Sequence, residues 1–142
     1  LWQGPHATID LLAQAVIEGG AALWLITLIT GGEPSTLAAL GWTVAYASMA
    51  HLAILGIEHF VTPSPTLHHE LAIRAIRFGA FRRVFWWGAI GLGSAAPILV
   101  VLGAMAGGLP AVGLALAALA ALGGGLAWEY VWVEAGQAVP IS

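Results

Sequence analysis

The chain contains no cysteine and few charged residues, and both absences restrict what it can be. Without cysteine it forms no disulfide and offers no thiolate to a metal or an iron–sulfur cluster. Charged residues make up 8% of its 142 residues, against roughly 25% in a soluble domain. Lysine is also absent, so the basic residues are four arginines, too few for a surface that binds nucleic acid.

Hydrophobic residues make up 60% of the chain, and they gather in four stretches with few charges. About 20 mostly apolar residues suffice for a helix to cross a bilayer. We therefore predict an all-α integral membrane protein: one transmembrane four-helix up-and-down bundle over residues 1–142, surrounded by membrane lipid. The expected helices cover about residues 7–30, 36–60, 84–106 and 110–135. Because the chain starts at Leu1 without a signal peptide, we expect it to be part of a longer protein.

The loop at His59–Arg83 holds every basic residue of the chain, namely Arg74, Arg77, Arg82 and Arg83. Its part His68–Phe81 alternates apolar and basic residues, which predicts a short amphipathic helix in the headgroup region. Loops rich in arginine stay on the cytoplasmic side. We therefore expect a multi-pass protein of the inner (cytoplasmic) membrane, with both termini and the arginine loop in the cytoplasm.

Two ionisable residues fall near the middle of the predicted bilayer, where a charged side chain is costly and usually has a partner or a function. From a rise of about 1.5 Å per residue, Glu18 lies roughly 16 Å and His51 roughly 14 Å from the arginine side. Glu58, seven residues after His51, shares its helix face, and Glu129 lies about one turn below the interface. These four residues are the candidates for a proton relay that runs from the arginine side to a Glu18–His51 contact.

Structural explanations compete with this relay. In the competing explanation, Glu18 and His51 form one buried pair that fixes the register of two helices. His59 and Glu134 are expected to reach the interface or to pair with Arg82 and Arg83. The tryptophans are expected to serve as packing residues and interface anchors, in particular Trp24, Trp42 and Trp128.

A haem bound inside the bundle would need axial histidines that face each other across helices. Only His51 lies well inside a predicted helix, whereas His59 lies at a helix end and His6 precedes the first helix. We therefore expect neither haem nor a metal ion in this chain, although a b-type cytochrome subunit stays an alternative.

Several motifs resemble the polysulfide-reductase membrane-subunit (NrfD-like) family. Phe85-Trp86-Trp87-Gly88 with Gly91, Gly93 and Pro97 is similar to one helix of that family. The segment Ala135-Gly-Gln-Ala-Val-Pro140 is similar to the end of its last helix, where Glu129 stands in place of an expected arginine. Trp2 and Pro5, followed by Glu18-Gly19-Gly20-Ala21, are similar to its fifth helix.

The resemblance implies that the chain corresponds to the C-terminal half of an eight-helix protein. It implies two partners, an iron–sulfur subunit and a molybdopterin catalytic subunit. It also implies electron exchange with membrane quinone, at a site that lies chiefly in the N-terminal half of the family's members. We expect a non-catalytic subunit of such an oxidoreductase complex. The alternatives are a purely structural anchor and a small transporter or channel, although the half beyond Glu18 has few polar groups for a transporter.

Overall fold

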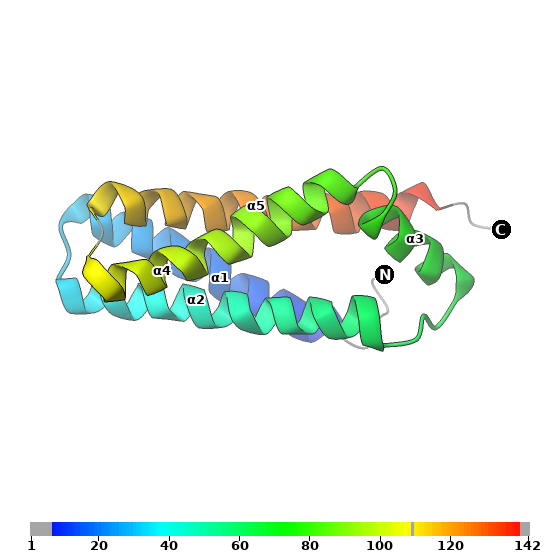
Figure 1. Cartoon of the computed structure of the whole chain (residues 1–142), viewed down its shortest axis with the longest axis horizontal. Helices are drawn as coiled ribbons and strands as arrows, with labels where there is room; N and C mark the ends of the chain where they lie inside the picture. The colour runs from blue at the N-terminus through cyan, green and yellow to red at the C-terminus, as the bar shows by residue number, and fades with distance from the viewer. Residues whose placement is uncertain (1–6, 109, 140–142) are drawn as a thin grey trace.

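Four long helices lie side by side in the computed structural model, which describes residues 7–108 and 110–139 apart from the side chain of Met105 (Figure 1). Four segments are long and apolar enough to cross a membrane: Ala7–Thr30, Pro34–Val61, Val84–Ala104 and Ala111–Ala138. The part of the chain described contains no strand. The prediction of an all-α membrane bundle is therefore confirmed.

The elements follow one another along the chain with short connections. They are α1 (Ala7–Thr30), α2 (Pro34–Gly56), the π-helix η1 (Ile57–Val61), α3 (Leu67–Arg77), the π-helix η2 (Val84–Ala95), α4 (Ala96–Gly107) and α5 (Ala111–Ala138). η1 continues α2, and α4 continues η2, so each pair forms one rod (Figure 1). The predicted helix limits differ from these by a few residues, as is usual at helix ends.

The two ends of the bundle differ in their connections. At one end, Gly31 and Gly108 adopt φ angles of 72° and 74°, the left-handed backbone that ends a helix most easily at glycine. Glu33 belongs to the first of these turns, just before α2, and we call this end the Glu33 end. At the opposite end α3 lies beside the start of α1 and the end of α5, and we call it the Arg end (Figure 1).

Helix α3 is the predicted amphipathic helix, and it covers the Arg end. It begins after Thr66, whose hydroxyl accepts a hydrogen bond of 3.1 Å from the backbone N–H of His69. Its apolar face is buried through Ala72, Ile73 and Ile76. Its basic residue Arg74 is exposed, so the helix presents one apolar and one charged face, as a headgroup-level helix should.

A proline inside a helix usually kinks it, and the structure accommodates Pro97 by a change of helix type. The π-helix η2 ends at Ala95, where the backbone N–H of Ala96 bonds to the carbonyl of Gly91. Pro97 then falls in the first turn of α4, where a missing N–H leaves no hydrogen bond broken.

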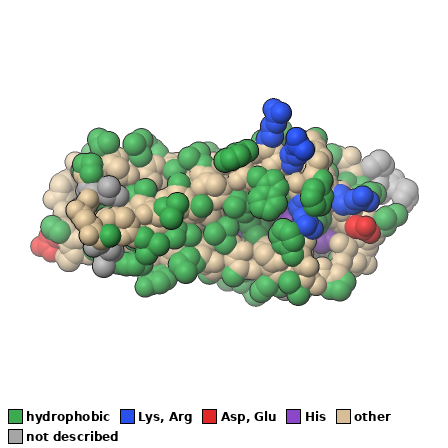
Figure 2. Space-filling model, in the orientation of Figure 1, with side chains coloured by type: hydrophobic (Ala, Val, Ile, Leu, Met, Phe, Trp, Pro, Cys, Tyr) green, Lys and Arg blue, Asp and Glu red, His purple; other side chains and the backbone are tan. Residues whose placement is uncertain are grey.

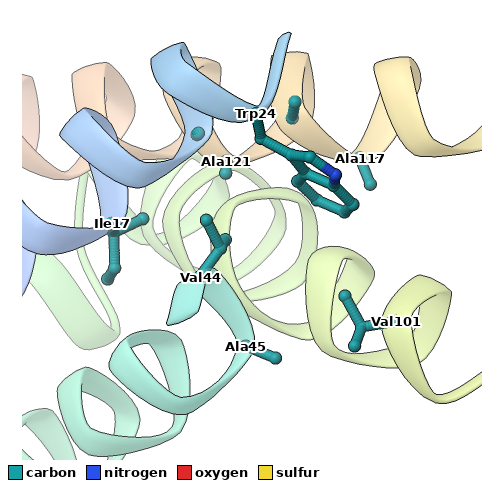
Figure 3. Packing of buried hydrophobic residues seen from close by; sticks show 9 residues of the cluster. Ile17, Trp24, Val44, Ala45, Val101, Ala117 and Ala121 are labelled. Carbon is teal, nitrogen blue, oxygen red and sulfur yellow. The ribbon is translucent and has the colours of Figure 1, made fainter. Parts of the chain in front are cut away.

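Two buried clusters fill the interior. The cluster toward the Glu33 end is mostly aliphatic and is built around Trp24, as Figure 3 shows; its other members include Ile17, Val44, Val101 and Ala121. The cluster at the Arg end is aromatic and includes Ile76, Phe85, Trp128 and Trp132. Both are shielded from lipid by an outer surface of exposed apolar side chains (Figure 2).

Between these clusters η2 and α5 touch backbone to backbone. A Cβ atom added to Gly93 would lie 2.6 Å from Cα of Gly124, so neither position has room for a side chain. Small residues allow such a close approach of two helices, and Gly124 supplies it on α5.

The predicted residues Trp2, Pro5, His6 and Pro140 lie outside the described residues. Figure 2 shows the arginine side chains gathered at the Arg end, while apolar side chains cover the length of the bundle. This distribution fits a protein that crosses a bilayer with its basic residues on one side.

Candidate functional site

A carboxylate and an imidazole lie together inside the Arg-end half of the bundle. Oδ1 of Asp10, in the first turn of α1, lies 3.0 Å from Nε2 of His51 in α2. Both residues are buried, with 3% and 4% of their surface exposed. Neither of these two atoms makes a hydrogen bond of good angular geometry within the described residues, so the contact is an ion-pair contact by distance.

The second oxygen of Asp10 is held by two donors. The indole Nε1 of Trp128, in α5, donates to Oδ2 over 3.1 Å, and the side-chain amide of Gln14 donates to it over 3.3 Å. The imidazole of His51 also meets Trp128 edge-on, with ring centroids 5.8 Å apart. Asp10 therefore links α1, α2 and α5 at one point, and Trp128 is a hydrogen-bond donor as well as a packing residue.

Two cavities lie on either side of Gln14. The larger, of about 280 Å³, opens between α1 and α5 at the Arg end, and its lining includes Asp10, Gln14 and Glu129. The smaller, of about 10 Å³, lies deeper, and its lining includes Gln14, Glu18, His51 and Ser94. A polar cavity of this second size holds about one water molecule.

Glu18 has its carboxyl group next to a glycine of the neighbouring helix. A Cβ atom on Gly125 would lie 3.1 Å from Cδ of Glu18 and closer still to Oε1, so the glycine leaves the space that the carboxyl group occupies. Oε1 of Glu18 is buried without a hydrogen-bond partner among the residues described, as is Oε1 of Gln14. Two polar oxygens near one small cavity mark a place that suits a water molecule.

A second polar group lies under α3. Oε1 of Glu58, in η1, lies 3.8 Å from Nε2 of His69, whose Nδ1 lies 3.2 Å from the hydroxyl of Ser64. Both Glu58 and His69 are buried. Burial lowers the pKa of His69, which lies outside the membrane-spanning segments, because it penalises the charged imidazolium.

Three of the four predicted relay residues line the two cavities described above: His51 and Glu18 line the smaller one, and Glu129 lines the larger one. Glu58 lines neither of these two cavities. The sequence predicted Glu18 as the partner of His51, but Asp10 is the carboxylate in ion-pair range of its ring, while Glu18 shares the small cavity with it. Glu58 pairs with His69.

His59 was expected to reach the interface or to pair with an arginine, and this was wrong. Its ring is buried and stacks on Phe85 with centroids 5.2 Å apart and a 6° angle between planes. Neither ring nitrogen has a hydrogen-bond partner in the described part of the chain, whereas its backbone carbonyl accepts a 2.8 Å hydrogen bond from Arg77. Arg77 thereby attaches α3 to η1, and no ion pair of the described residues joins Glu134 to Arg82 or Arg83.

Asp10 is the site residue that sequence reasoning missed. It is the only aspartate of the chain, and an acid in the first turn of a helix has an ordinary explanation, because it interacts favourably with the positive end of the helix dipole. Its spacing contained the missing signal: Asp10, Gln14 and Glu18 follow one another every four residues and so lie on one helix face. The residues that the structure describes contain no group of three or more histidine, aspartate or glutamate side chains that could hold a metal ion.

Comparison with known proteins gives one match. The family model described as polysulphide reductase, NrfD matches residues 1–141, nearly the whole chain. No curated protein and no solved structure matches the sequence significantly. The match agrees with four membrane-crossing helices and with the resemblance drawn from the glycine and tryptophan motifs. This chain therefore belongs to the NrfD polysulphide reductase family.

Proposed function

We propose that this chain is the integral membrane subunit of a quinone-linked oxidoreductase, where it anchors an iron–sulfur subunit and a molybdopterin catalytic subunit and conducts protons. Membership of the NrfD family supports the role of a membrane anchor in a reductase complex. The single observation that carries the proton function is the buried Asp10–His51 contact: Asp10 lines the larger cavity at the Arg end, and His51 lines the smaller one.

The proton path enters through the larger cavity. Glu129 is exposed and lines that cavity together with Asp10, so it can collect protons at the Arg end. Asp10 passes a proton to His51, since an imidazole binds a proton on one nitrogen and releases one from the other. A water molecule in the small cavity then joins His51 to Glu18, the innermost acid.

Glu58 forms a side branch of this path. Its contact with His69 brings it near the surface under α3, where Ser64 is exposed. Glu58 lies seven residues after His51 on the same rod, about 10 Å along it at 1.5 Å per residue. A bound quinone would supply electron transfer coupled to the uptake or release of protons.

We further propose that the Arg end faces the cytoplasm and that the bundle lies in the inner membrane. The basic residues Arg74, Arg82 and Arg83 are exposed at that end, and positively charged loops are retained on the cytoplasmic side. Labelling of a cysteine placed at Ser64, in cells otherwise intact, tests this orientation. A membrane-impermeant reagent should leave Ser64→Cys unlabelled until the membrane is opened.

The proton function is tested on the complex purified from native membranes. Glu18→Gln should lower quinone-linked turnover or its proton coupling by at least about tenfold, as expected when a proton-transfer group is removed. Glu33→Gln, which changes an exposed acid at the other end, is the matched control. If the chain only anchors the complex, both variants will keep full turnover and the iron–sulfur subunit will still co-purify.

The same preparation tests the expected absence of haem. Nε2 of His51 faces Asp10, so the imidazole is already engaged on the side that a haem iron would need. A reduced-minus-oxidised spectrum of the purified subunit should lack a b-type band. A band that disappears in His51→Ala would identify the chain as a cytochrome subunit instead.

A further inference from the structure

A third cavity opens at the surface of the Arg end, where the end of α3 meets the start of η2. It has a volume of about 510 Å³, and its lining residues are Arg77, Phe78, Arg82, Arg83, Trp86 and Trp87. Three of the chain's four arginines thus lie around one hollow, and none of the described lining residues is acidic. The two cavities of the candidate site share no lining residue with it.

The two walls of this cavity are attached to each other and to the bundle. The indole Nε1 of Trp86, in η2, donates a hydrogen bond of 3.2 Å to the backbone carbonyl of Arg77, in α3. The guanidinium of Arg77 donates in turn to the carbonyl of His59 and lies over the ring of Phe60, 4.0 Å from its centroid. These contacts hold α3 and η2 in place, so the cavity is formed before a ligand binds.

Arg82 and Arg83 differ from Arg77, because the protein makes no use of their charges. Both are exposed, and neither forms an ion pair within the described residues. Glu70 is the only acid of α3 and lies seven residues before Arg77, about 10 Å away along the helix. Figure 2 shows arginine side chains projecting from this end. Guanidinium groups bind phosphate oxygens through paired hydrogen bonds, so two unpaired ones beside a cavity indicate a phosphate-bearing ligand.

The aromatic part of the cavity indicates that this ligand is a lipid. Trp87 is 79% exposed and lies three residues after Val84, where the membrane-crossing segment begins, about 5 Å inside that end at 1.5 Å per residue. Tryptophan is enriched at this level of a bilayer. Arg82 and Arg83 directly precede the segment, at the level of the lipid phosphates. A lipid reaches both levels at once, whereas a soluble protein or a free phosphate reaches only the outer one.

We propose that this cavity binds the headgroup of an anionic phospholipid, with its phosphate on Arg82 and Arg83 and its glycerol and first acyl carbons against Trp87. Charge selects the lipid. Phosphatidylcholine carries a cationic group beside its phosphate, which the three arginines repel, whereas phosphatidylglycerol carries negative charge alone. A lipid held there contacts both α3 and η2, and so joins the amphipathic helix to the membrane-crossing rod from outside.

The test measures lipid binding by native mass spectrometry. The protein is purified in detergent with the subunits that co-purify, and its native lipid is removed. The probes are phosphatidylglycerol, phosphatidylcholine with the same acyl chains, and glycerol 1-phosphate, which separate an anionic lipid from a zwitterionic one and from a free phosphate. We expect phosphatidylglycerol to bind at least about tenfold more tightly than phosphatidylcholine. Glycerol 1-phosphate should not displace it.

Two single variants remove the same charge at different places. Arg83→Gln should weaken phosphatidylglycerol binding roughly tenfold, because it removes charge-assisted hydrogen bonds to the phosphate. Arg74→Gln, at an exposed arginine of α3 that does not line the cavity, should leave binding almost unchanged. Arg83 is exposed and has no ion-pair partner among the described residues, so its replacement should not disturb folding. The selectivity of the unmodified protein decides independently of both variants.

The proposal is overturned if phosphatidylcholine binds as tightly as phosphatidylglycerol, if glycerol 1-phosphate displaces the lipid, or if Arg83→Gln and Arg74→Gln weaken binding equally. Loss of a co-purifying subunit in Arg83→Gln, with lipid binding retained, would assign this surface to a protein partner and would overturn it as well. Failure here is distinct from failure of the proposed function, because the effect of Glu18→Gln on turnover does not depend on this cavity.

Discussion

The Arg end and the Glu33 end of the bundle differ in the contacts that their buried polar side chains make. At the Arg end Asp10 is contacted by three side chains from its own and two other helices, and the surrounding core is aromatic. At the Glu33 end the core is aliphatic, and Trp24 carries a buried N–H without a partner. One half thus resembles a polar network that fixes three helices, and the other an apolar compartment in which the Trp24 N–H has no partner among the described residues.

The largest expected effect comes from removing the centre of the polar half. Asp10→Ala leaves His51 and the Trp128 indole buried without their carboxylate, and we expect a loss of roughly 3 kcal/mol in the free energy of unfolding. Glu33→Ala, at an exposed acid, should cost almost nothing. Unfolding in mixed micelles with increasing SDS measures both, and equal midpoints would contradict the role of Asp10.

The boundary between the halves is tested at the backbone contact of η2 and α5. Gly124→Ala would drive a methyl group into the backbone of Gly93, and it should cost about 1–3 kcal/mol of the free energy of unfolding. Gly123→Ala adds the same methyl group where no atom lies within 4 Å. The same SDS titration should leave the second variant unchanged or slightly more stable, because alanine forms helix better than glycine. A similar loss of stability in both variants would contradict the role of close packing at Gly124.

A smaller effect is expected where α3 covers the polar half. Thr66→Ala removes the acceptor for the backbone N–H of His69 and should cost about 1 kcal/mol, confined to α3. Hydrogen exchange should rise in Leu67–Arg77 and stay constant in α1, α2 and α5. Thr36→Ala, an exposed position in the first turn of α2, is the control, and a global rise in exchange would contradict the local role of the cap.

The smallest effect concerns the stability of the protein at acidic pH, and it depends on His69 in α3. The pKa of His69 is lowered from its ordinary value of 6.5 by burial. Between the lowered value and 6.5 the unfolded chain binds more protons than the folded one, so stability falls as the pH drops through this window. His69→Gln should reduce the loss of thermal stability on acidification, while His68→Gln should not. An identical acid response in the parent protein and His69→Gln would contradict this.

Most of the fold was predictable because the bilayer imposes it. Segments of about 20 apolar residues that must satisfy their own backbone hydrogen bonds can only be helices in a membrane. Short turns at Gly31 and Gly108 then leave an up-and-down bundle. The π-helices were not predictable in the same way, because the change of hydrogen-bond pattern near Gly91 and Pro97 depends on how η2 packs on α5.

The candidate site was predictable only in part. His51 and Glu18 stood out because an ionisable group in a long apolar stretch needs a reason. Which carboxylate contacts His51 depends on how α1 is rotated about its own axis relative to α2. The depth of a residue in the bilayer does not determine that rotation. Asp10 escaped notice because an acid in the first turn of a helix has an ordinary electrostatic explanation, and only the fold shows that its side chain points inward.

The π-helical segment η2 makes the membrane-crossing rod a composite of two helix types. Its hydrogen bonds span five residues, and those of α4 beyond it span four. Deletion of one residue between Ala96 and Val101, in the regular α-helix, would rotate Phe85 by about 100° relative to Val101 on the same rod. Deletion of one residue within η2 can instead be taken up by converting a wide turn to α-helix. The π-helical segment is therefore the part of this rod where a change of length need not rotate the aromatic core against the aliphatic one.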